Sequence, residues 1–162
     1  MPTVHIVSGL IGSGKSTLAR RLERELPALR VSLDEWVIGL FGAEMPEQLK
    51  GDWWSDRCGR CSRLSYAVAR QALAAGVDVV LDCGFLERWH RDEARAWARE
   101  AGASTKLYWV RAETAVRRAR VERRNLEQGE TFALVVTDAM FDALPWEPPS
   151  EEELTGGSVL DT

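Results

Sequence analysis

The chain has 162 residues, a formal net charge of −4 and 45% hydrophobic residues, which is ordinary for a folded domain. Its length fits a single domain over residues 1–162, and no apolar run approaches the roughly 20 residues that cross a bilayer. The N-terminus lacks the basic and apolar regions of a signal peptide, so we expect a cytoplasmic protein without a membrane partner. The mild acidity argues against a nucleic-acid coat protein, although 18 of the 21 basic residues are Arg, whose positions matter more than their total.

Apolar periodicity divides the chain into strands and helices that alternate. In chain order, the first half predicts a strand over 3–8, a Gly-rich turn over 9–15, a helix over 16–26, a strand over 29–33, a helix over 36–41, a polar loop over 43–52 and a helix over 53–75. The second half predicts a strand over 77–82, a helix over 88–101, a strand over 105–110, an Arg-rich helix over 112–125, a polar turn over 126–132, a short helix from an N-cap at Thr137 to about 144, and an edge strand over 158–160. This alternation is typical of a three-layer α/β fold, in which helices cover both faces of a parallel sheet.

The Gly-rich turn matches a phosphate-binding motif. Residues 9–16, GLIGSGKS, fit the pattern G-x-x-x-x-G-K-[ST] between a strand and a helix, and this context disfavours a chance Gly-rich turn. Glycines let backbone N–H groups converge on an anion, and the helix N-terminus adds positive charge. Lys15 is predicted to reach the β- and γ-phosphates and Ser16 to bind Mg²⁺. The predicted nucleotide contacts in this loop are Gly9, Gly12, Ser13, Gly14, Lys15, Ser16 and Thr17.

Other nucleotide-binding classes fit less well. A GTPase would need an N/T-K-x-D motif after a strand, and the third strand ends in Asp-Cys-Gly rather than D-x-x-G. A ring ATPase would need an additional helical domain, for which the chain is too short. The sequence therefore predicts a small phosphotransferase that uses ATP with Mg²⁺.

Two carboxylates follow predicted strands at the edge where the phosphate loop lies. Asp34 comes after the second strand and is the candidate that accepts or orients the proton of the acceptor. Asp82 ends the third strand and is the candidate for a Mg²⁺ contact, together with Ser16. Glu35 could replace either carboxylate. The structural alternatives are a helix cap for Asp34 and a turn residue for Asp82.

Aromatic and cysteine residues give weaker signals. Trp36, Trp53 and Trp54 are expected either to line the acceptor pocket or to pack in the core. Cys58 and Cys61 form a C-x-x-C pattern, but no strand precedes it and too few further ligands are present for zinc. We therefore interpret this pair as structural, on one side of a helix.

The Arg-rich helix is predicted to be a lid over the nucleotide, within a lid region of about 112–136. At about 100° per residue, Arg117, Arg120 and Arg124 lie within about 60° of one another, while small apolar residues share roughly the opposite side. Arginines stabilise charge on the transferred phosphoryl group, so Arg120 and Arg124 are the leading phosphate contacts, with Arg117 beside them. A solvated basic face is the alternative. The loop 127–131 would be the hinge side, and the acidic tail 147–162 is expected on the surface.

Taken together, these features resemble the small P-loop kinases of the polynucleotide kinase, zeta toxin and chloramphenicol phosphotransferase group. The matching segments are GLIGSGKST at 9–17, VSLDEW at 31–36, VVLDCGF at 79–85 and RVERRN at 120–125, with ALVVTDAMFDAL and WEPP later in the chain. The resemblance implies a P-loop NTPase fold with a five-stranded parallel sheet in the order 2-3-1-4-5, Mg·ATP, and transfer of the γ-phosphate to a hydroxyl. It also implies that Asp34 activates the acceptor, that Arg120 and Arg124 are lid arginines, and that Arg91 lies near the acceptor.

The leading hypothesis is an ATP-dependent kinase of a hydroxyl on a small molecule, such as a nucleoside, a sugar or an antibiotic, in which Asp34, Lys15 and Arg120 are catalytic. A 5′-hydroxyl polynucleotide kinase is the alternative, and nucleic acid is the less favoured partner. That alternative needs a basic groove leading to Asp34, to which Arg57, Arg60, Arg63, Arg88 and Arg91 could contribute. An ATP-binding module without acceptor chemistry is a third hypothesis. The sequence indicates neither the acceptor nor the oligomeric state.

Overall fold

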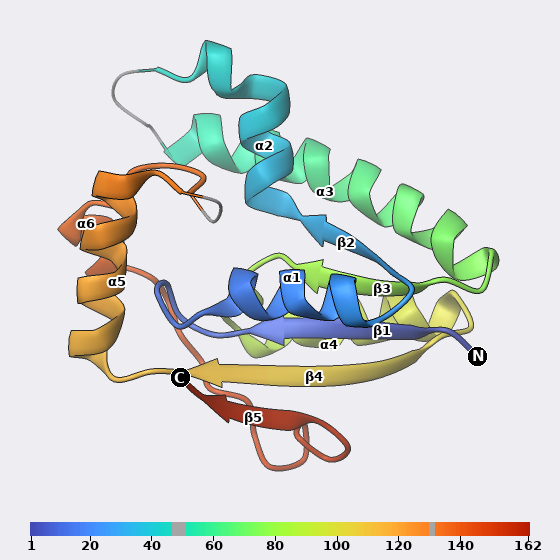
Figure 1. Cartoon of the computed structure of the whole chain (residues 1–162). Coiled ribbons are helices and arrows are strands. Elements are labelled where there is room, and N and C mark those ends of the chain that lie inside the picture. The colour runs from blue at the N-terminus through green and yellow to red at the C-terminus, as the bar shows by residue number, and fades with distance from the viewer. Residues whose placement is uncertain (47–50, 130–131) are drawn as a thin grey trace.

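The computed structural model describes residues 1–46, 51–129 and 132–162, which form a sheet flanked by helices (Figure 1). The strands are β1 (Thr3–Ser8), β2 (Ala28–Ser32), β3 (Asp78–Asp82), β4 (Ser104–Arg111) and β5 (Ser158–Asp161). The helices are α1 (Lys15–Glu25), α2 (Leu33–Phe41), α3 (Gly51–Ala74), α4 (Arg88–Glu100), α5 (Thr114–Glu127) and α6 (Asp138–Asp142), with the 3₁₀ turn η1 (Gly42–Glu44). Within these residues no helix is long and apolar enough to cross a membrane.

The sheet has the strand order β2-β3-β1-β4-β5, and every neighbouring pair is parallel. This confirms the predicted order, including the edge strand β5, which pairs with β4 from Tyr108↔Ser158 to Arg111↔Asp161. The connection after β1 leads by α1 to β2 on one side of β1, and the connection after β3 leads by α4 to β4 on the other side. Because the strands are parallel, they all end at one edge of the sheet. A crevice is therefore expected at the carboxyl ends of the strands, on the left in Figure 1.

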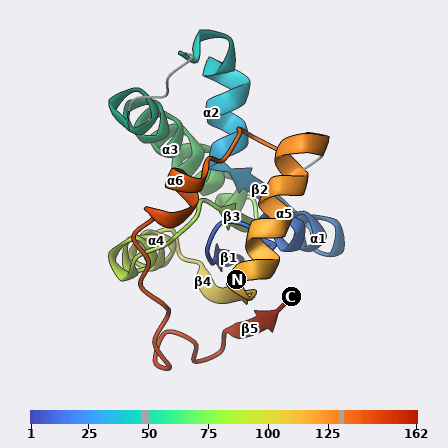
Figure 2. The ribbon, with the colours of Figure 1, turned by 90° about the vertical axis from the view of Figure 1, so that its left-hand side faces the viewer.

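Two apolar layers hold the helices on the sheet. Successive residues of a strand point to opposite faces, and β1 shows this directly. Val4 and Ile6 pack with residues of α3 and α4, whereas Val7 packs with Leu18 and Leu22 of α1. Figure 2 shows the result, with α1 on one side of the sheet and α3 and α4 on the other.

The predicted boundary between the second strand and the next helix is wrong. β2 ends at Ser32 and α2 begins at Leu33, so Asp34 lies in the first turn of a helix rather than after a strand. The N-cap is Ser32, so Asp34 is not the cap of this helix. Apolar residues continue from one element into the other, and periodicity alone does not separate them.

The Arg-rich helix α5 and the short helix α6 lie beyond the carboxyl ends of the strands (Figures 1 and 2). Helix α5, the predicted lid, runs from Thr114 rather than from residue 112. Thr137 caps α6 by accepting a hydrogen bond from the Met140 amide, as predicted. The predicted hinge 127–131 and the predicted loop 43–52 both reach outside the described residues, at 130–131 and 47–50.

Candidate active site

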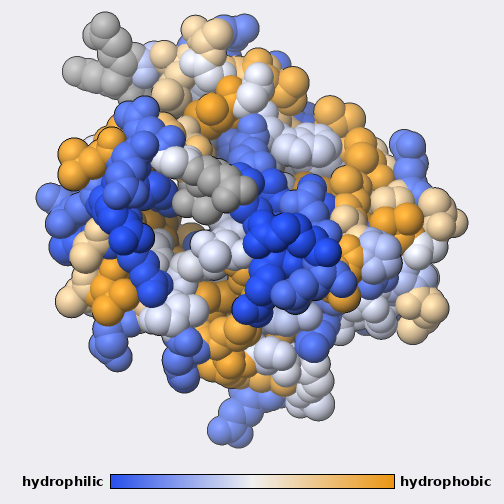
Figure 3. Space-filling model, in the orientation of Figure 1, coloured by the Kyte–Doolittle hydropathy of each residue, from blue (hydrophilic) through white to orange (hydrophobic). Residues whose placement is uncertain are grey.

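A cavity of about 920 Å³ opens at the carboxyl ends of the strands. Its lining comes from the phosphate loop, α1, α2, α3, the loop after β3, α5 and the segment around α6. Figure 3 shows two strongly hydrophilic areas, over α5 and over α1, that flank a hollow in the surface. The cavity therefore lies where an open parallel sheet places its ligands.

The phosphate loop packs too tightly for side chains at two of its glycines. A Cβ at Gly9 would lie 2.4 Å from the carbonyl oxygen of Val110, and a Cβ at Gly12 would lie 2.5 Å from the carbonyl oxygen of Arg117. Both residues also have positive φ angles, which L side chains rarely adopt. These constraints explain why the loop needs glycine, whose missing side chain lets the loop backbone approach the end of β4 and the helix α5.

Lys15 begins α1 on the wall of the cavity. Its Nζ donates to the carbonyl oxygen of Leu10 at 3.0 Å, within the phosphate loop. Desolvation lowers the pKa of Lys15, while the nearby carboxylates of Asp82 and Asp34 oppose that shift. The lysine is thus enclosed by protein and faces two acidic groups, as a phosphate-binding lysine beside a metal and an acceptor site would be.

Asp34 and Asp82 lie on the same cavity, as predicted. Enclosure by the surrounding protein and the charge of Asp82 raise the pKa of Asp34, and Lys15 and Arg124 oppose the rise. Asp34 nevertheless faces the open space of the cavity, so it is accessible to a ligand. A carboxylate in this environment gains a proton more readily than a surface Asp, which suits a group that accepts one.

Asp82 has the features of a Mg²⁺ ligand. It is only 6% exposed, and among the described residues its Oδ2 has no hydrogen-bond donor. Desolvation raises its pKa, while Lys15 and a hydrogen bond from Ser16 lower it. The described residues hold no cluster of three His, Cys, Asp or Glu that could bind a metal. Mg²⁺ often takes one or two protein ligands and completes its shell with phosphate and water, so Ser16 and Asp82 fit this ion.

Glu35 does not replace either carboxylate, which corrects the prediction. Arg20 contacts it at 2.6 Å, and Arg30 pairs with both of its oxygens at 2.7 and 3.2 Å. These hydrogen bonds and charges lower the pKa of Glu35 against the effect of its burial. The network instead fixes the first turn of α2, which carries Asp34. Nη1 of Arg30 also lies 4.0 Å from Oδ2 of Asp82, so Arg30 connects Glu35 to Asp82.

Two of the predicted lid arginines line the cavity, and the third does not. Arg120 and Arg124 both face it. Desolvation lowers the pKa of Arg124, Asp34 raises it, and its Nε has no acceptor within the described residues. Arg120 donates to the hydroxyl of Thr162 at 2.8 Å. Arg124, like Lys15, is therefore a cation near Asp34 that has no hydrogen bond to an acid within the described residues.

Arg117 does not line the cavity, unlike the other two arginines. It is 8% exposed, donates to the carbonyl oxygen of Ile11 at 3.1 Å and lies over the ring of Phe141 at 4.8 Å. Because Ile11 belongs to the phosphate loop, Arg117 attaches α5 to that loop. The helical wheel places the three arginines together, but it does not show which of them points into the packed interface.

The comparisons with known proteins agree with this geometry. The sequence profile of a family described as an AAA domain matches residues 4–144. The chain belongs to this family, AAA_33. Its P-loop NTPase fold is the one that the phosphate loop and strand order predict. No curated protein matches the sequence.

Solved structures share the fold at low sequence identity. Kti12 of Chaetomium thermophilum, in complex with ADP-AlF3, is 20% identical, with a TM-score of 0.73 over 98% of this chain and 88% of that one. A sugar kinase from Janibacter sp. HTCC2649 is 19% identical, with a TM-score of 0.67 over 99% and 86%. The APS kinase CysC of Mycobacterium tuberculosis, in complex with AMPPNP and APS, is 18% identical, with a TM-score of 0.63 over 99% and 88%.

The predicted aromatic contacts divide between the cavity and other surroundings. Trp54 lines the cavity, whereas Trp36 and Trp53 do not. Trp53 lies under the guanidinium of Arg57, whose Cζ is 4.4 Å from the ring centroid. All three cysteines are free. Cys58 lines the cavity with a pKa that burial raises to about 12, so it is a neutral thiol.

Arg91 is not at the acceptor, which corrects the expectation from the resemblance. It is fully buried and pairs with both oxygens of Glu153, at 2.8 and 3.1 Å. It also donates to the carbonyl oxygens of Phe85 and Glu147, at 3.2 and 2.9 Å. The acidic tail is consequently not all surface, because the side chain of Glu153 is 4% exposed. Sequence analysis missed this pair, since its members are 62 positions apart and no local pattern joins them.

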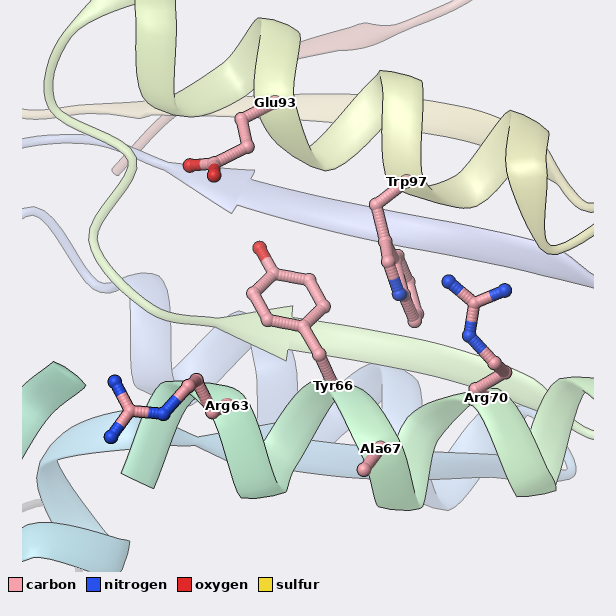
Figure 4. Close-up of a pocket in the computed structure, with 6 residues that line it drawn as sticks. All are labelled: Arg63, Tyr66, Ala67, Arg70, Glu93 and Trp97. Carbon is pink, nitrogen blue, oxygen red and sulfur yellow. The ribbon is translucent and has the colours of Figure 1, made fainter. Parts of the chain in front are cut away.

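A basic groove leading to Asp34 is not formed by the arginines proposed for it. Arg57 and Arg60 pair with Asp56, at 3.4 and 3.0 Å, and Arg88 pairs with Asp92 at 3.4 Å. Arg63 lines a separate pocket between α3 and α4, where Tyr66 and Trp97 meet edge to face with centroids 4.7 Å apart (Figure 4). That pocket contains neither the phosphate loop nor Asp34.

Proposed function

We propose that this protein is an ATP-dependent phosphotransferase that moves the γ-phosphate of Mg·ATP to a hydroxyl of a small molecule. The observation that carries the proposal is Asp34, which faces the same cavity as Lys15, Asp82 and Arg124. A protein that only bound nucleotide would need no carboxylate at this place. The printed names of two structures with this fold, a sugar kinase and an APS kinase, support phosphotransfer as the type of reaction.

Each group has a role that its position suits. Amides of the phosphate loop and Lys15 bind the phosphates. The acceptor oxygen attacks the γ-phosphorus while its proton passes to a carboxylate oxygen of Asp34, and the bond from the γ-phosphorus to the bridging oxygen breaks to leave ADP. Arg124, with Arg120 once it leaves Thr162, stabilises charge on the transferred group. Ser16 and Asp82 would hold Mg²⁺, which when bound would neutralise charge on the phosphate oxygens.

The charge pattern favours a small acceptor over a polynucleotide. Arg57, Arg60 and Arg88 are paired with acidic residues, and Arg91 is buried. Because these four arginines are already engaged, they do not form a track of free cations to Asp34 that would bind the phosphates of a nucleic acid.

The test is transfer from γ-labelled ATP to a panel of hydroxyl compounds, with ADP release measured in parallel. Asp34→Asn should lower kcat by about 10²-fold or more while leaving the Kd of ATP nearly unchanged, because it removes the proton acceptor and not a phosphate contact. Lys15→Ala should instead weaken ATP binding. ATP binding without transfer to any acceptor would favour a nucleotide-binding module, and unchanged turnover in Asp34→Asn would refute the mechanism.

A further inference from the structure

The cavity has two walls of different chemistry. Seen from the carboxyl ends of the strands, α1 and α5 lie on one side, and α3 and α6 lie on the other (Figure 2). The wall formed by α1 and α5 is basic. Its cations are Lys15, Arg21, Arg24, Arg120, Arg123 and Arg124. This concentration of charge suits the triphosphate and leaves the opposite wall for the acceptor.

The opposite wall is almost entirely apolar. Its residues come from α3, the loop after β3, and α6 with the residue following Ala143, and all are partly exposed to the cavity. They are Trp54, Cys58, Cys83, Leu86, Met140 and Leu144. Burial raises the pKa of the Cys58 thiol to about 12 and raises that of Cys83 as well, so neither adds charge. This wall can exclude water and pack against carbon, but it offers few hydrogen bonds.

Most polar side chains near this wall already have partners. Glu35 is held by Arg20 and Arg30. Asp82 accepts a hydrogen bond from Ser16, and its unpaired Oδ2 is the oxygen that would bind Mg²⁺. Ser32 is only 5% exposed. Among the described residues on this side, Asp34 is the carboxylate left to contact the reactive hydroxyl of an acceptor, and the indole N–H of Trp54 is one further donor. A sugar would bring several more hydroxyls, and each one buried without a partner costs roughly tenfold or more in affinity.

We infer that the acceptor is an alcohol with a largely apolar body, aromatic or aliphatic, that carries its reactive hydroxyl at one end. The hydroxyl contacts Asp34, and the body packs against Trp54, Leu86 and Leu144. The inference rests on the proposed function and narrows its substrate class, away from sugars, free nucleosides and polynucleotides. Affinity then comes from burial of apolar area, and orientation comes from a single polar contact.

The experiment compares two series of acceptors at saturating Mg·ATP. The apolar series is benzyl alcohol and 2-naphthalenemethanol, and the polar series is glucose, uridine and a 5′-hydroxyl hexathymidylate. We expect kcat/KM to rise with apolar area within the first series and to exceed the values of the second series by about tenfold or more. Preference for glucose, uridine or the oligonucleotide would overturn the inference and leave phosphotransfer itself intact.

Variants locate the effect on the apolar wall. Leu144→Asn should lower kcat/KM for 2-naphthalenemethanol by about tenfold through KM, without changing the KM of ATP, and Leu144→Met should restore most of it. Leu64→Asn is the matched control, because Leu64 lies on α3 outside the cavity and is 52% exposed. An equal decrease of kcat/KM in Leu64→Asn would show that the effect does not come from a contact between Leu144 and the acceptor.

A binding measurement keeps the inference separate from turnover. With the non-hydrolysable analogue AMPPNP and Mg²⁺ bound, saturable binding of 2-naphthalenemethanol by ligand-observed NMR should be present in the wild type and weakened in Leu144→Asn. Binding of this kind without transfer would support the apolar site and refute the proposed function. Absence of saturable binding, or binding that Leu144→Asn leaves unchanged, would refute the inference whatever the turnover.

Discussion

At the scale of single residues, the site keeps a carboxylate in an unfavourable environment. Asp34 shares the cavity with Asp82, and its pKa is raised above the ordinary value of 3.8 by enclosure and by that second negative charge. A carboxylate held in this way reduces stability where it is charged, as is common when activity and stability conflict at a site. Replacing Asp34 should therefore raise stability and lower turnover.

Replacing Asp34 should stabilise the protein at neutral pH while it lowers the rate of transfer. The folded-state pKa of Asp34 lies above its unfolded value, so its carboxyl favours the fold below about pH 3.8 and disfavours it once pH rises through the folded pKa. Asp34→Asn should thus raise Tm at pH 7, and the difference should vanish as pH falls below 4. Thermal unfolding without nucleotide measures this.

Asp52→Asn is the matched control for that change. Asp52 also lies in the first turn of a helix, α3, and is exposed as Asp34 is, but it does not line the cavity. Its carboxylate interacts favourably with the helix N-terminus, so its loss should leave Tm unchanged or slightly lower. A lower Tm for Asp34→Asn at pH 7 would show that Asp34 is a structural residue.

The residues of the phosphate loop can be predicted from the sequence, but the contacts between residues distant in the chain cannot. Lys15 and Ser16 are predictable because they belong to one continuous motif. Arg30 could not be assigned, because it reaches Glu35 and Asp82 only after β2 pairs with β3. A side chain's role depends on what the fold brings beside it, as the burial of Arg91 also shows.

At the scale of elements, the loop after β3 depends on the tail. Gly84 and Phe85 have positive φ angles, and Phe85 is a large side chain for that conformation. The carbonyl oxygen of Phe85 accepts from Ser8 at 2.8 Å and from Arg91 at 3.2 Å. Because Arg91 is paired with Glu153, the tail fixes the loop that carries Cys83 and Leu86 into the cavity.

Glu153→Gln should destabilise the fold by about 3 kcal/mol at pH 7, since it leaves the Arg91 guanidinium buried with a weaker partner. The pKa of Glu153 is lowered to about 2, by hydrogen bonds and charge from Arg91 and Arg95 that outweigh its burial. Its contribution is full above the ordinary value of 4.5 and is lost as pH falls toward 2. Urea unfolding should therefore show a gap between wild type and variant that narrows below pH 4.5.

Glu152→Gln provides the comparison for the tail. The side chain of Glu152 lies next to Glu153 in the sequence, is 85% exposed and has its Oε2 3.7 Å from Nη2 of Arg88. An exposed ion pair of this kind contributes little to stability. We expect a change within about 0.5 kcal/mol. An equal loss in both variants, or a gap that does not depend on pH, would argue against the buried pair.

The elements themselves were predicted better than their ends. Strand order followed from the family resemblance, and β1 was placed correctly because Gly9 ends its apolar run. The start of α2 was wrong because Leu33 continues the apolar run of β2 into the helix. That one boundary decides whether Asp34 lies on a strand end or on a helix turn, yet it leaves the residue at the same edge of the sheet.

At the scale of the whole molecule, residues from near both ends of the chain line the same cavity. Its lining extends from Ile11 to Thr162, and the hydroxyl of Thr162 donates to the carbonyl oxygen of Ser13 at 2.9 Å. A ligand that binds here contacts elements from nearly every part of the fold. Nucleotide should therefore stabilise the protein as a unit.

Mg·ATP at about 100 times its Kd should stabilise the native state by about 2.7 kcal/mol, because it binds the folded form alone. This corresponds to a rise in Tm of about 5–10 °C for a chain of this size. Lys15→Met should lose most of the shift. Differential scanning fluorimetry with Mg·ATP and, as a control, with Mg²⁺ alone measures it, and an equal shift in the variant would place the nucleotide elsewhere.

Charge over the whole surface predicts poor binding of nucleic acid. The net charge is −4, and three of the arginines on α3 and α4 are paired with acids, although the cavity wall of α1 and α5 is basic. The Kd for a fluorescent single-stranded dodecathymidylate should be weaker than about 100 μM at 150 mM salt, the weak end of non-specific binding. Anisotropy at 50 and 200 mM salt tests this. Micromolar binding with a steep salt dependence would instead favour the alternative of a polynucleotide kinase, since only several free cations can produce that slope.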